Sequence, residues 1–283
     1  MGEVSVWQLR PARVYGGEAL PVQLDTAPGS LDESSKMLPG GGYTTFRTFG
    51  ANRVMQFDSH IARLEETARL AGKPVTLPAT HVRAALRQAV TSYPSEEKRV
   101  RITLDLEQEI GSVYIAVEEL RVPAADQYLH GVRTVTRQAR RENPKAKLTN
   151  FIKTAGAIRG ELPPGINEAL MVANGTILEG LTSNFFAIIE GELWTAEEGV
   201  LSGLTRALVL EEATATGLVI RLSPVPVDSL PRAQEAFITS ASRAVLPVIQ
   251  IDDLLIGDGQ PGPVTLDLLA RYQARIEAET EAI

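Results

Sequence analysis

Strand-like and helix-like segments alternate along both halves of this chain, and that alternation limits the folds that it can adopt. Residues 43–49 and 113–117 place β-branched or aromatic side chains at every second position, as strands do. Between them, apolar residues recur at helical spacing from Asp58, which can cap a helix, to Gly72, which can end it. The first half is therefore rich in strands, with helices between them.

The rest of the chain continues this alternation. We expect further strands at residues 99–104, 132–138, 168–173, 184–190, 218–222, 235–240 and 244–251. We expect further helices near residues 80–90, 150–161, 204–216 and 264–281. Strands and helices that interleave in this way favour an α/β or α+β protein of two domains with a cleft between them.

The segment at residues 120–127 loses this periodicity and contains Pro123, which marks a connection. We place the connection at residues 122–128, between a small N-terminal α/β domain (residues 1–121) and a larger C-terminal domain (residues 129–283). A chain of 283 residues is long enough for two modest domains.

The composition argues against several kinds of chemistry and partner. The chain has no cysteine, so disulfides, thiolate catalysis and cysteine zinc sites are excluded. Its three histidines, His60, His81 and His130, lie in separate segments without metal-site spacing, and we expect no metal. A net charge of −7 argues against a nucleic-acid partner and favours a small molecule. Because the sequence has neither an apolar run near the ~20 residues of a membrane span nor a secretory leader, we expect no membrane partner and a cytoplasmic location.

Four motifs follow one another over about 60 residues of the second half. They are Lys147-Leu148-Thr149-Asn150, Asn167-Glu168-Ala169, a stretch from Glu179 to Ser183-Asn184-Phe185-Phe186, and Leu201-Ser202-Gly203-Leu204-Thr205-Arg206. In order and approximate spacing, this set resembles the second half of the class IV aminotransferases. That family holds branched-chain aminotransferases, D-amino acid aminotransferases and aminodeoxychorismate lyases. The resemblance implies a fold-type IV enzyme that uses pyridoxal 5'-phosphate in a cleft between its domains, with the larger domain binding the cofactor.

The resemblance assigns two residues to the reactive part of the cofactor. Lys147 is implied to be the catalytic lysine, which forms a Schiff base with the cofactor and shuttles protons. Lys145 and Lys153 are the neighbours that could be confused with it, but the spacing to Asn150 and Glu179 selects Lys147. Glu179 is implied to face the pyridine nitrogen and keep it protonated, so that the ring can accept electrons.

The phosphate needs positive charge and hydrogen-bond donors, which a helix N-terminus supplies. Gly203 opens a predicted helix, so the backbone N–H groups of Leu204 and Thr205 and the Thr205 hydroxyl form a candidate cradle. Arg63 is carried over from the family's His-x-x-Arg-Leu motif as the charged phosphate ligand. Ser240 and Ser242 flank Ala241, where branched-chain enzymes often have a threonine, and are candidate hydroxyl donors.

The substrate residues depart from the family pattern. Phe151 stands where branched-chain enzymes have a tyrosine, and the Arg-x-His pair of D-amino acid enzymes is absent after the strand at residues 99–106. A substrate carboxylate suits the planar fork of an arginine. We expect Arg47 to bind it, because Arg47 shares a strand face with Tyr43 that borders the active site in the family. Arg99, Arg101 and Arg243 are the other candidates, and Tyr43 is a further expected substrate contact.

The leading hypothesis is therefore a transaminase with ping-pong chemistry, in which an amino acid or primary amine gives its amino group to a 2-oxo acid through the cofactor. A lyase of the aminodeoxychorismate type, which eliminates pyruvate, is one alternative. A binding protein that keeps the fold without catalysis is another. The family resemblance also implies a homodimer.

Overall fold

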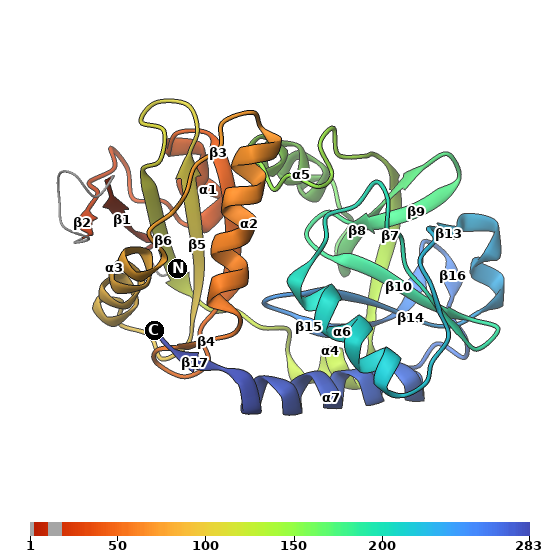
Figure 1. Cartoon of the computed structure of the whole chain (residues 1–283). Helices are drawn as coiled ribbons and strands as arrows, with labels where there is room; N and C mark the ends of the chain where they lie inside the picture. The colour runs from red at the N-terminus through yellow and green to blue at the C-terminus, as the bar shows by residue number, and fades with distance from the viewer. Residues whose placement is uncertain (1–2, 11–18) are drawn as a thin grey trace. The chain divides into compact units, whose positions relative to one another are not determined.

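The computed structural model describes residues 3–10 and 19–283, and the chain divides into two compact units (Figure 1). The first unit contains the described residues of Met1–Arg121 together with Ala146–Thr154 and Glu279–Ile283. The second contains Val122–Lys145 and Ala155–Ala278. The helix α5 (Asn150–Gly160) begins in the first unit and continues in the second. Among the described residues, no helix is both long enough and apolar enough to cross a membrane.

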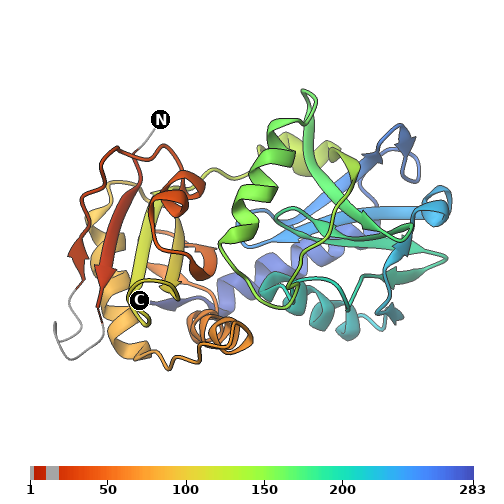
Figure 2. The same cartoon turned by 90° about the horizontal axis from the view of Figure 1, so that it is seen from above.

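The described part of the first unit is built on an antiparallel sheet with helices on both faces (Figures 1 and 2). The order of the strands is β2 (Leu20–Pro21), β1 (Ser5–Leu9), β6 (Val113–Glu119), β5 (Lys98–Asp105) and β3 (Gly41–Arg47). Its helices are α1 (Leu31–Met37), α2 (Phe57–Leu70) and α3 (Ala79–Ser92). Near the C-terminus, β17 (Glu281–Ala282) pairs with β4 (Arg53–Val54).

The alternation of side chains along β3 gives its two faces different partners. Thr44 and Phe46 point towards α2, where both contact His60. Tyr43 and Thr45 point to the other face, where the Arg101 guanidinium contacts both of them. The period-two pattern predicted from the sequence thus separates an α2 side of the sheet from an α1 side.

The second unit is built on a sheet of short and long strands. Within the described residues, their order is β12 (Ile220–Arg221), β11 (Glu192–Trp194), β10 (Asn184–Ile189), β14 (Ala233–Ser240), β15 (Ala244–Ile251), β7 (Val132–Gln138), β8 (Ile166–Ala173), β9 (Thr176–Gly180) and β13 (Val225–Pro226), with β16 (Leu254–Leu255) beside β15. Because β9 pairs with β10 as well as with β8, the strands from β10 to β9 close into a ring. Leu170, Ile177, Phe185 and Leu246 belong to a buried apolar cluster formed by these strands.

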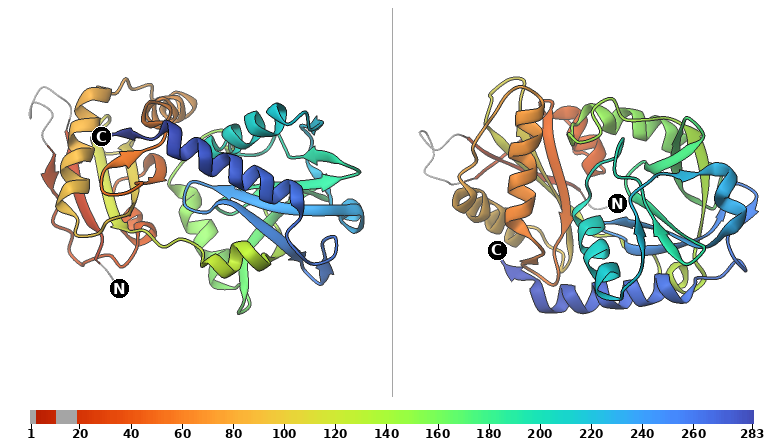
Figure 3. Two further views of the ribbon diagram at one scale, coloured as in Figure 1. Left: turned by 90° about the horizontal axis from the view of Figure 1, so that it is seen from below. Right: turned by 45° about the vertical axis from the view of Figure 1, so that its right-hand side comes forward.

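Helices of the second unit surround this ring. They are α4 (Ala125–His130), the 3-10 helix Val227–Arg232, α6 (Leu204–Ala215) and α7 (Pro263–Glu279). Figure 3 shows α6 and α7 side by side, and Arg275 on α7 reaches Glu211 and Glu212 on α6 at 2.6 and 3.4 Å. The start of α7 is held by Glu235 of β14, whose carboxylate accepts the N–H groups of Val264 and Thr265 at 3.0 and 2.7 Å.

The structure corrects two local predictions. Asp58 lies in the first turn of α2, and Gln56, with φ of 52°, is the capping residue. The strand expected at residues 218–222 is reduced to Ile220–Arg221. The helix α4 begins at Ala125, within the expected connection at residues 122–128. That connection and the limits of the two predicted domains remain a prediction.

Candidate active site

Lys147 lies on a short extended segment that continues the sheet of the first unit beyond β3. Its carbonyl oxygen accepts the N–H of Tyr43 at 2.8 Å, and the N–H of Thr149 donates to Gly41 at 2.9 Å. Gly41 is also constrained on its other side, because a Cβ atom there would overlap the carbonyl oxygen of Leu104 on β5. The glycine at the start of β3 therefore permits close backbone packing against β5.

The Lys147 side chain lies among aromatic and basic groups of the first unit. Its ammonium nitrogen is 4.8 Å from the centre of the Tyr43 ring. Burial first, and then the positive charges of Arg63 and Lys147, lower the pKa of His60 from 6.5 to about 3. Arg63 is half-buried, and its removal from water lowers its pKa to about 10, although the nearby Tyr43 raises it in part. The structure thus brings three predicted residues, Lys147, Tyr43 and Arg63, together.

His60 stays neutral at the centre of this group because of its low pKa. Its Nδ1 lies 2.6 Å from the Thr44 hydroxyl oxygen, and its ring packs against Phe46 with centres 4.6 Å apart. These contacts join α2, which carries Arg63, to β3, which carries Tyr43. The role of His60 as a link between the two elements was not predictable from its local sequence.

Glu179 lies on β9 in the second unit, almost completely buried. Its Oε1 accepts the Nε–H of Arg141 at 2.6 Å. Its Oε2 accepts the Asn184 amide at 3.3 Å and the N–H of Leu201 at 3.2 Å. The arrangement holds the carboxylate in one orientation.

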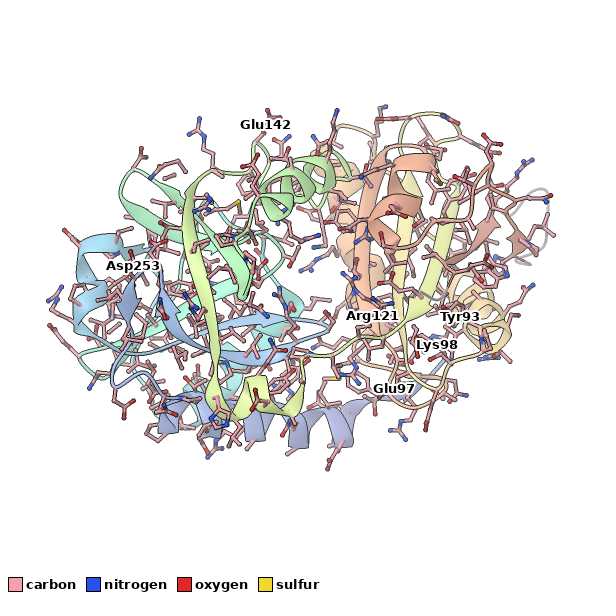
Figure 4. All side chains as sticks on the ribbon, turned by 180° about the vertical axis from the view of Figure 1, so that it is seen from behind. Tyr93, Glu97, Lys98, Arg121, Glu142 and Asp253 are labelled. Atoms are coloured by element: carbon pink, nitrogen blue, oxygen red, sulfur yellow. The ribbon has the colours of Figure 1, made fainter. Side chains whose placement is uncertain are left out.

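Arg141 is the main residue of this group that sequence reasoning missed. It follows Arg140 and precedes Glu142, a charged run that is typical of a solvated surface. Arg141 is nevertheless buried, whereas its neighbour Glu142 is exposed at the outside of the second unit (Figure 4). Nothing in the local pattern distinguishes the two, so only the fold identifies Arg141.

The N-terminus of α6 lies next to the Glu179 group. Asn184, which donates to Glu179, also donates to the Leu201 carbonyl oxygen at 2.7 Å. Gly203 is the N-cap of α6, and a Cβ atom there would overlap the Asn184 amide oxygen. Gly203 has no side chain that could cap the helix. The N–H groups of the first turn, which begins at Leu204 and Thr205, therefore form the type of site that binds anions.

The predicted serines lie at the turn between β14 and β15. The Ser240 hydroxyl oxygen accepts the Nε–H of Arg243 at 3.1 Å. Ser242 is half-buried in the same turn. The Arg243 guanidinium also forms an ion pair with the buried carboxylate of Glu168 at 2.8 Å.

The arginines proposed for substrate binding have acidic partners within their own units. Arg47 donates to Glu97 at 2.7 Å, and its guanidinium lies 4.7 Å from the centre of the Phe49 ring. Figure 4 locates Glu97 beside Lys98, at the start of β5. Arg101, on the face that carries Tyr43, pairs with Asp32 of α1 at 2.9 Å. The Arg47 guanidinium is therefore already engaged in an ion pair with Glu97.

Comparison with known proteins identifies the family of this chain. The family model of class IV aminotransferases matches residues 41–251. A "Probable branched-chain-amino-acid aminotransferase" of Thermotoga maritima is 29% identical over 253 residues, covering 86% of this chain and 90% of the relative. A D-alanine aminotransferase of Bacillus licheniformis is 26% identical over 275 residues, covering 88% of this chain and 92% of the relative.

Solved structures agree in fold. A fold IV-transaminase from Curtobacterium pusillum superimposes with a TM-score of 0.76 at 21% identity, over 98% of this chain and 99% of the other. The branched-chain aminotransferase of Thermoproteus uzoniensis with norvaline gives 0.75 at 24% identity, over 100% and 99%. This chain therefore belongs to the class IV aminotransferases and is a transaminase of the fold-type IV class, which uses pyridoxal 5'-phosphate and acts on amino acids and 2-oxo acids.

Proposed function

We propose that Lys147 is the lysine that binds the cofactor aldehyde and moves the proton during transamination. Its carbonyl oxygen accepts the N–H of Tyr43 on β3 at 2.8 Å, and its N–H donates to the Thr67 hydroxyl on α2 at 3.3 Å. These bonds support the assignment, because covalent catalysis needs an amine at a fixed place. Lys145 has other contacts, since its ammonium group donates to the Glu197 carbonyl oxygen at 2.7 Å. Lys153 is exposed on α5.

Glu179 is assigned to the pyridine nitrogen and the N-terminus of α6 to the phosphate. The observation that carries this proposal is the position of Asn184, which donates both to Glu179 and to the Leu201 carbonyl just before α6. A carboxylate and a helix N-terminus, suited to opposite ends of one cofactor, are thereby held in one unit.

The remaining phosphate donors are assigned by their chemistry. Arg63 supplies positive charge from a half-buried position, and Ser240 and Ser242 supply hydroxyls from the β14–β15 turn. Together with Leu204 and Thr205 they match an anionic group. An amine, a buried carboxylate and these donors form a set that fits pyridoxal 5'-phosphate.

Bound pyridoxal 5'-phosphate supplies an aldehyde that takes up the amino group and a ring that accepts electrons. Lys147 would hold the cofactor through its aldehyde, and its Nζ atom would take up and release the proton that is moved. Glu179 would face the ring nitrogen and keep it protonated. The donor leaves as a 2-oxo acid before the acceptor, such as 2-oxoglutarate, binds, so the kinetics are ping-pong.

Arg47 and Tyr43 are the proposed substrate contacts. Tyr43 supports this assignment because its ring lies beside the Lys147 ammonium group, whereas Arg47 lies further along β3 beside Glu97. Arg243 is another predicted partner of the carboxylate. Its contacts with Glu168 and Ser240 favour a different role.

We propose a homodimer in the cytoplasm, by resemblance to the family. The proposed domains are residues 1–121 and 129–283, with residues 122–128 as their connection. Sedimentation of the purified protein measures the oligomer directly. A monomer that is fully active would contradict the dimer.

A donor panel tests the function. Purified protein is mixed with pyridoxal 5'-phosphate, and its visible absorbance is recorded before and after addition of L-amino acids, D-amino acids or (R)-amines. A spectral change that a 2-oxo acid reverses, with an amino acid formed, is the expected result. Release of pyruvate from aminodeoxychorismate would support the lyase instead, and no spectral change with any donor would support a non-catalytic protein.

A further inference from the structure

A buried polar network in the second unit connects two loops that carry proposed cofactor residues. At its centre are Glu168 on β8 and Arg243 in the turn between β14 and β15. Both side chains are largely shielded from solvent, with 3% of Glu168 and 15% of Arg243 exposed. An ion pair this deep needs further hydrogen bonds to offset the loss of water.

Glu168 has those hydrogen bonds. Its Oε1 accepts the N–H and the hydroxyl of Thr182 at 2.7 and 2.8 Å, and its Oε2 accepts the Ser183 hydroxyl at 2.7 Å. Burial raises the pKa of Glu168, but the Arg243 charge and the hydrogen bonds of Ser183 and Thr182 outweigh it and bring the pKa below its ordinary value. Glu168 is therefore an ionised carboxylate in the interior.

These bonds hold the turn that follows Glu179. The turn begins at Gly180, whose N–H donates to the Ser183 carbonyl oxygen at 2.9 Å. A Cβ atom on Gly180 would overlap the Ser183 hydroxyl oxygen, and it would come within 3.0 Å of the Glu168 carboxyl carbon. The network is thus packed directly against the residue next to Glu179.

Arg243 extends the same network to the second loop. Its guanidinium donates to the Thr182 hydroxyl at 2.8 Å, to Asn167 Oδ1 at 3.3 Å and to the Ser240 hydroxyl at 3.1 Å. Its own carbonyl oxygen accepts the Tyr128 hydroxyl at 2.9 Å, which anchors the turn. One guanidinium therefore bonds the turn after Glu179 and a proposed phosphate donor.

We propose that Arg243 is a positioning residue, which through Glu168 and Ser240 keeps the pyridine-binding and phosphate-binding loops at a fixed separation and thereby sets the affinity for pyridoxal 5'-phosphate. The proposal rests on the cofactor assignments of Glu179 and Ser240 above. It gives Arg243 no contact with the substrate carboxylate, because its donors are already directed to Glu168, Thr182, Ser240 and Asn167.

The test compares Arg243→Gln, Glu168→Gln and the double variant. Each apoenzyme is titrated with pyridoxal 5'-phosphate, and the dissociation constant is read from visible absorbance. Arg243→Gln leaves Glu168 charged and unpaired, so we expect its dissociation constant to rise about tenfold or more. The double variant removes both charges, so its dissociation constant for the cofactor should return a large part of the way to the wild-type value. The matched control is Arg232→Gln, which breaks an exposed pair with Glu190 in the same unit and should change the constant less than about twofold.

Kinetics separate positioning from substrate binding. We expect Arg243→Gln to leave the ratio of KM values for an amino acid and a carboxylate-free amine unchanged, while kcat falls for both. Arg243→Lys keeps the charge without the planar fork and should lie between the wild type and Arg243→Gln. It also serves as the test variant if Arg243→Gln does not fold.

Two results would overturn the proposal. One is an unchanged cofactor dissociation constant in Arg243→Gln with KM raised for amino acids alone, which would make Arg243 the carboxylate ligand. The other is strictly additive losses in the double variant, which would show that Arg243 and Glu168 act independently. Failure of the proposed function looks different, because the wild type itself would then show no absorbance change on titration.

Discussion

The Nε atom of Arg141 lies 2.6 Å from Oε1 of Glu179, and both side chains are almost completely buried. The guanidinium also donates to the Leu181 carbonyl oxygen at 3.2 Å. Arg141 therefore supports the carboxylate and the start of the following turn together. This gives Glu179 a fixed position before any cofactor binds.

Glu179→Gln should retain bound cofactor but lower kcat at least about 100-fold, because an amide cannot stabilise a protonated ring nitrogen as a carboxylate does. Steady-state turnover and cofactor absorbance measure the two effects separately. Glu190→Gln, at an exposed position of the same unit, is the control. Near-normal turnover of Glu179→Gln would remove Glu179 from the mechanism.

Arg141→Gln should lower the free energy of unfolding by about 3 kcal/mol, since it leaves the buried Glu179 carboxylate without its guanidinium partner. Urea denaturation of the apoenzyme measures this. The Arg141→Gln/Glu179→Gln double variant should be less destabilised than the sum of the single variants. Additive losses would mean that the two side chains are not energetically coupled.

Lys147→Ala should abolish both turnover and the visible absorbance of covalently bound cofactor while leaving the fold intact. One missing amine deletes the covalent link. Circular dichroism checks the fold. Lys153→Ala, at an exposed position of α5, should behave as the wild type. An inactive Lys153→Ala together with an active Lys147→Ala would assign the Schiff base to Lys153.

Arg47→Lys should raise KM for amino and 2-oxo acids about tenfold and leave KM for a simple primary amine nearly unchanged, because a point charge cannot replace two parallel hydrogen bonds. The control is Glu97→Gln, which removes the contact that Arg47 makes in the structure. Equal effects of the two variants on both substrate types would indicate that Arg47 acts through Glu97 in the sheet.

Acid should destabilise the protein through His60. The pKa of His60 is lowered from 6.5 to about 3 by burial and by Arg63 and Lys147, so the folded protein keeps it neutral while the unfolded chain binds a proton. The contribution of neutral His60 to the free energy of unfolding is complete above pH 6.5. It is lost as pH falls towards about 3, by up to ~1.4 kcal/mol per pH unit.

His60→Gln should therefore lower the free energy of unfolding at neutral pH. It should also reduce the slope of that free energy against pH, because unfolding then takes up as much as about one proton fewer. Urea titrations from about pH 4 to about pH 7 measure the slope. His130→Gln, which removes an exposed imidazole, should keep the wild-type slope. An unchanged slope in His60→Gln would show that His60 does not titrate differently in the two states.

Elements with a clear local period were predictable from the sequence. The strands Val132–Gln138 and Ala244–Ile251 have the predicted bounds, because alternation along a strand is a local property. The helix Leu31–Met37 was missed although it has a local signal. Ser30 accepts the N–H of Glu33 at 3.2 Å, and a serine three residues before a glutamate is a capping pattern.

Other features depend on contacts between distant segments. Pairing of β9 with both β8 and β10 cannot be read from the five residues of Thr176–Gly180 alone. Arg141 pairs with Glu179, 38 residues further along the chain, and Arg243 pairs with Glu168, 75 residues before it. No sequence window of helical or strand length contains such a pair, so their roles emerge only from the fold.

The ring of strands in the second unit has a consequence for changes in chain length. Its closure by β9 and β10 rests on the single register pair of Glu179 with Asn184, and only residues 180–183 separate these two residues in the chain. Adding or deleting one residue there would move Asn184 out of register with Glu179 and remove the hydrogen bond from the Asn184 amide to the Glu179 carboxylate. Efforts to change substrate preference can therefore exchange side chains elsewhere, but the length of this connection has to be kept.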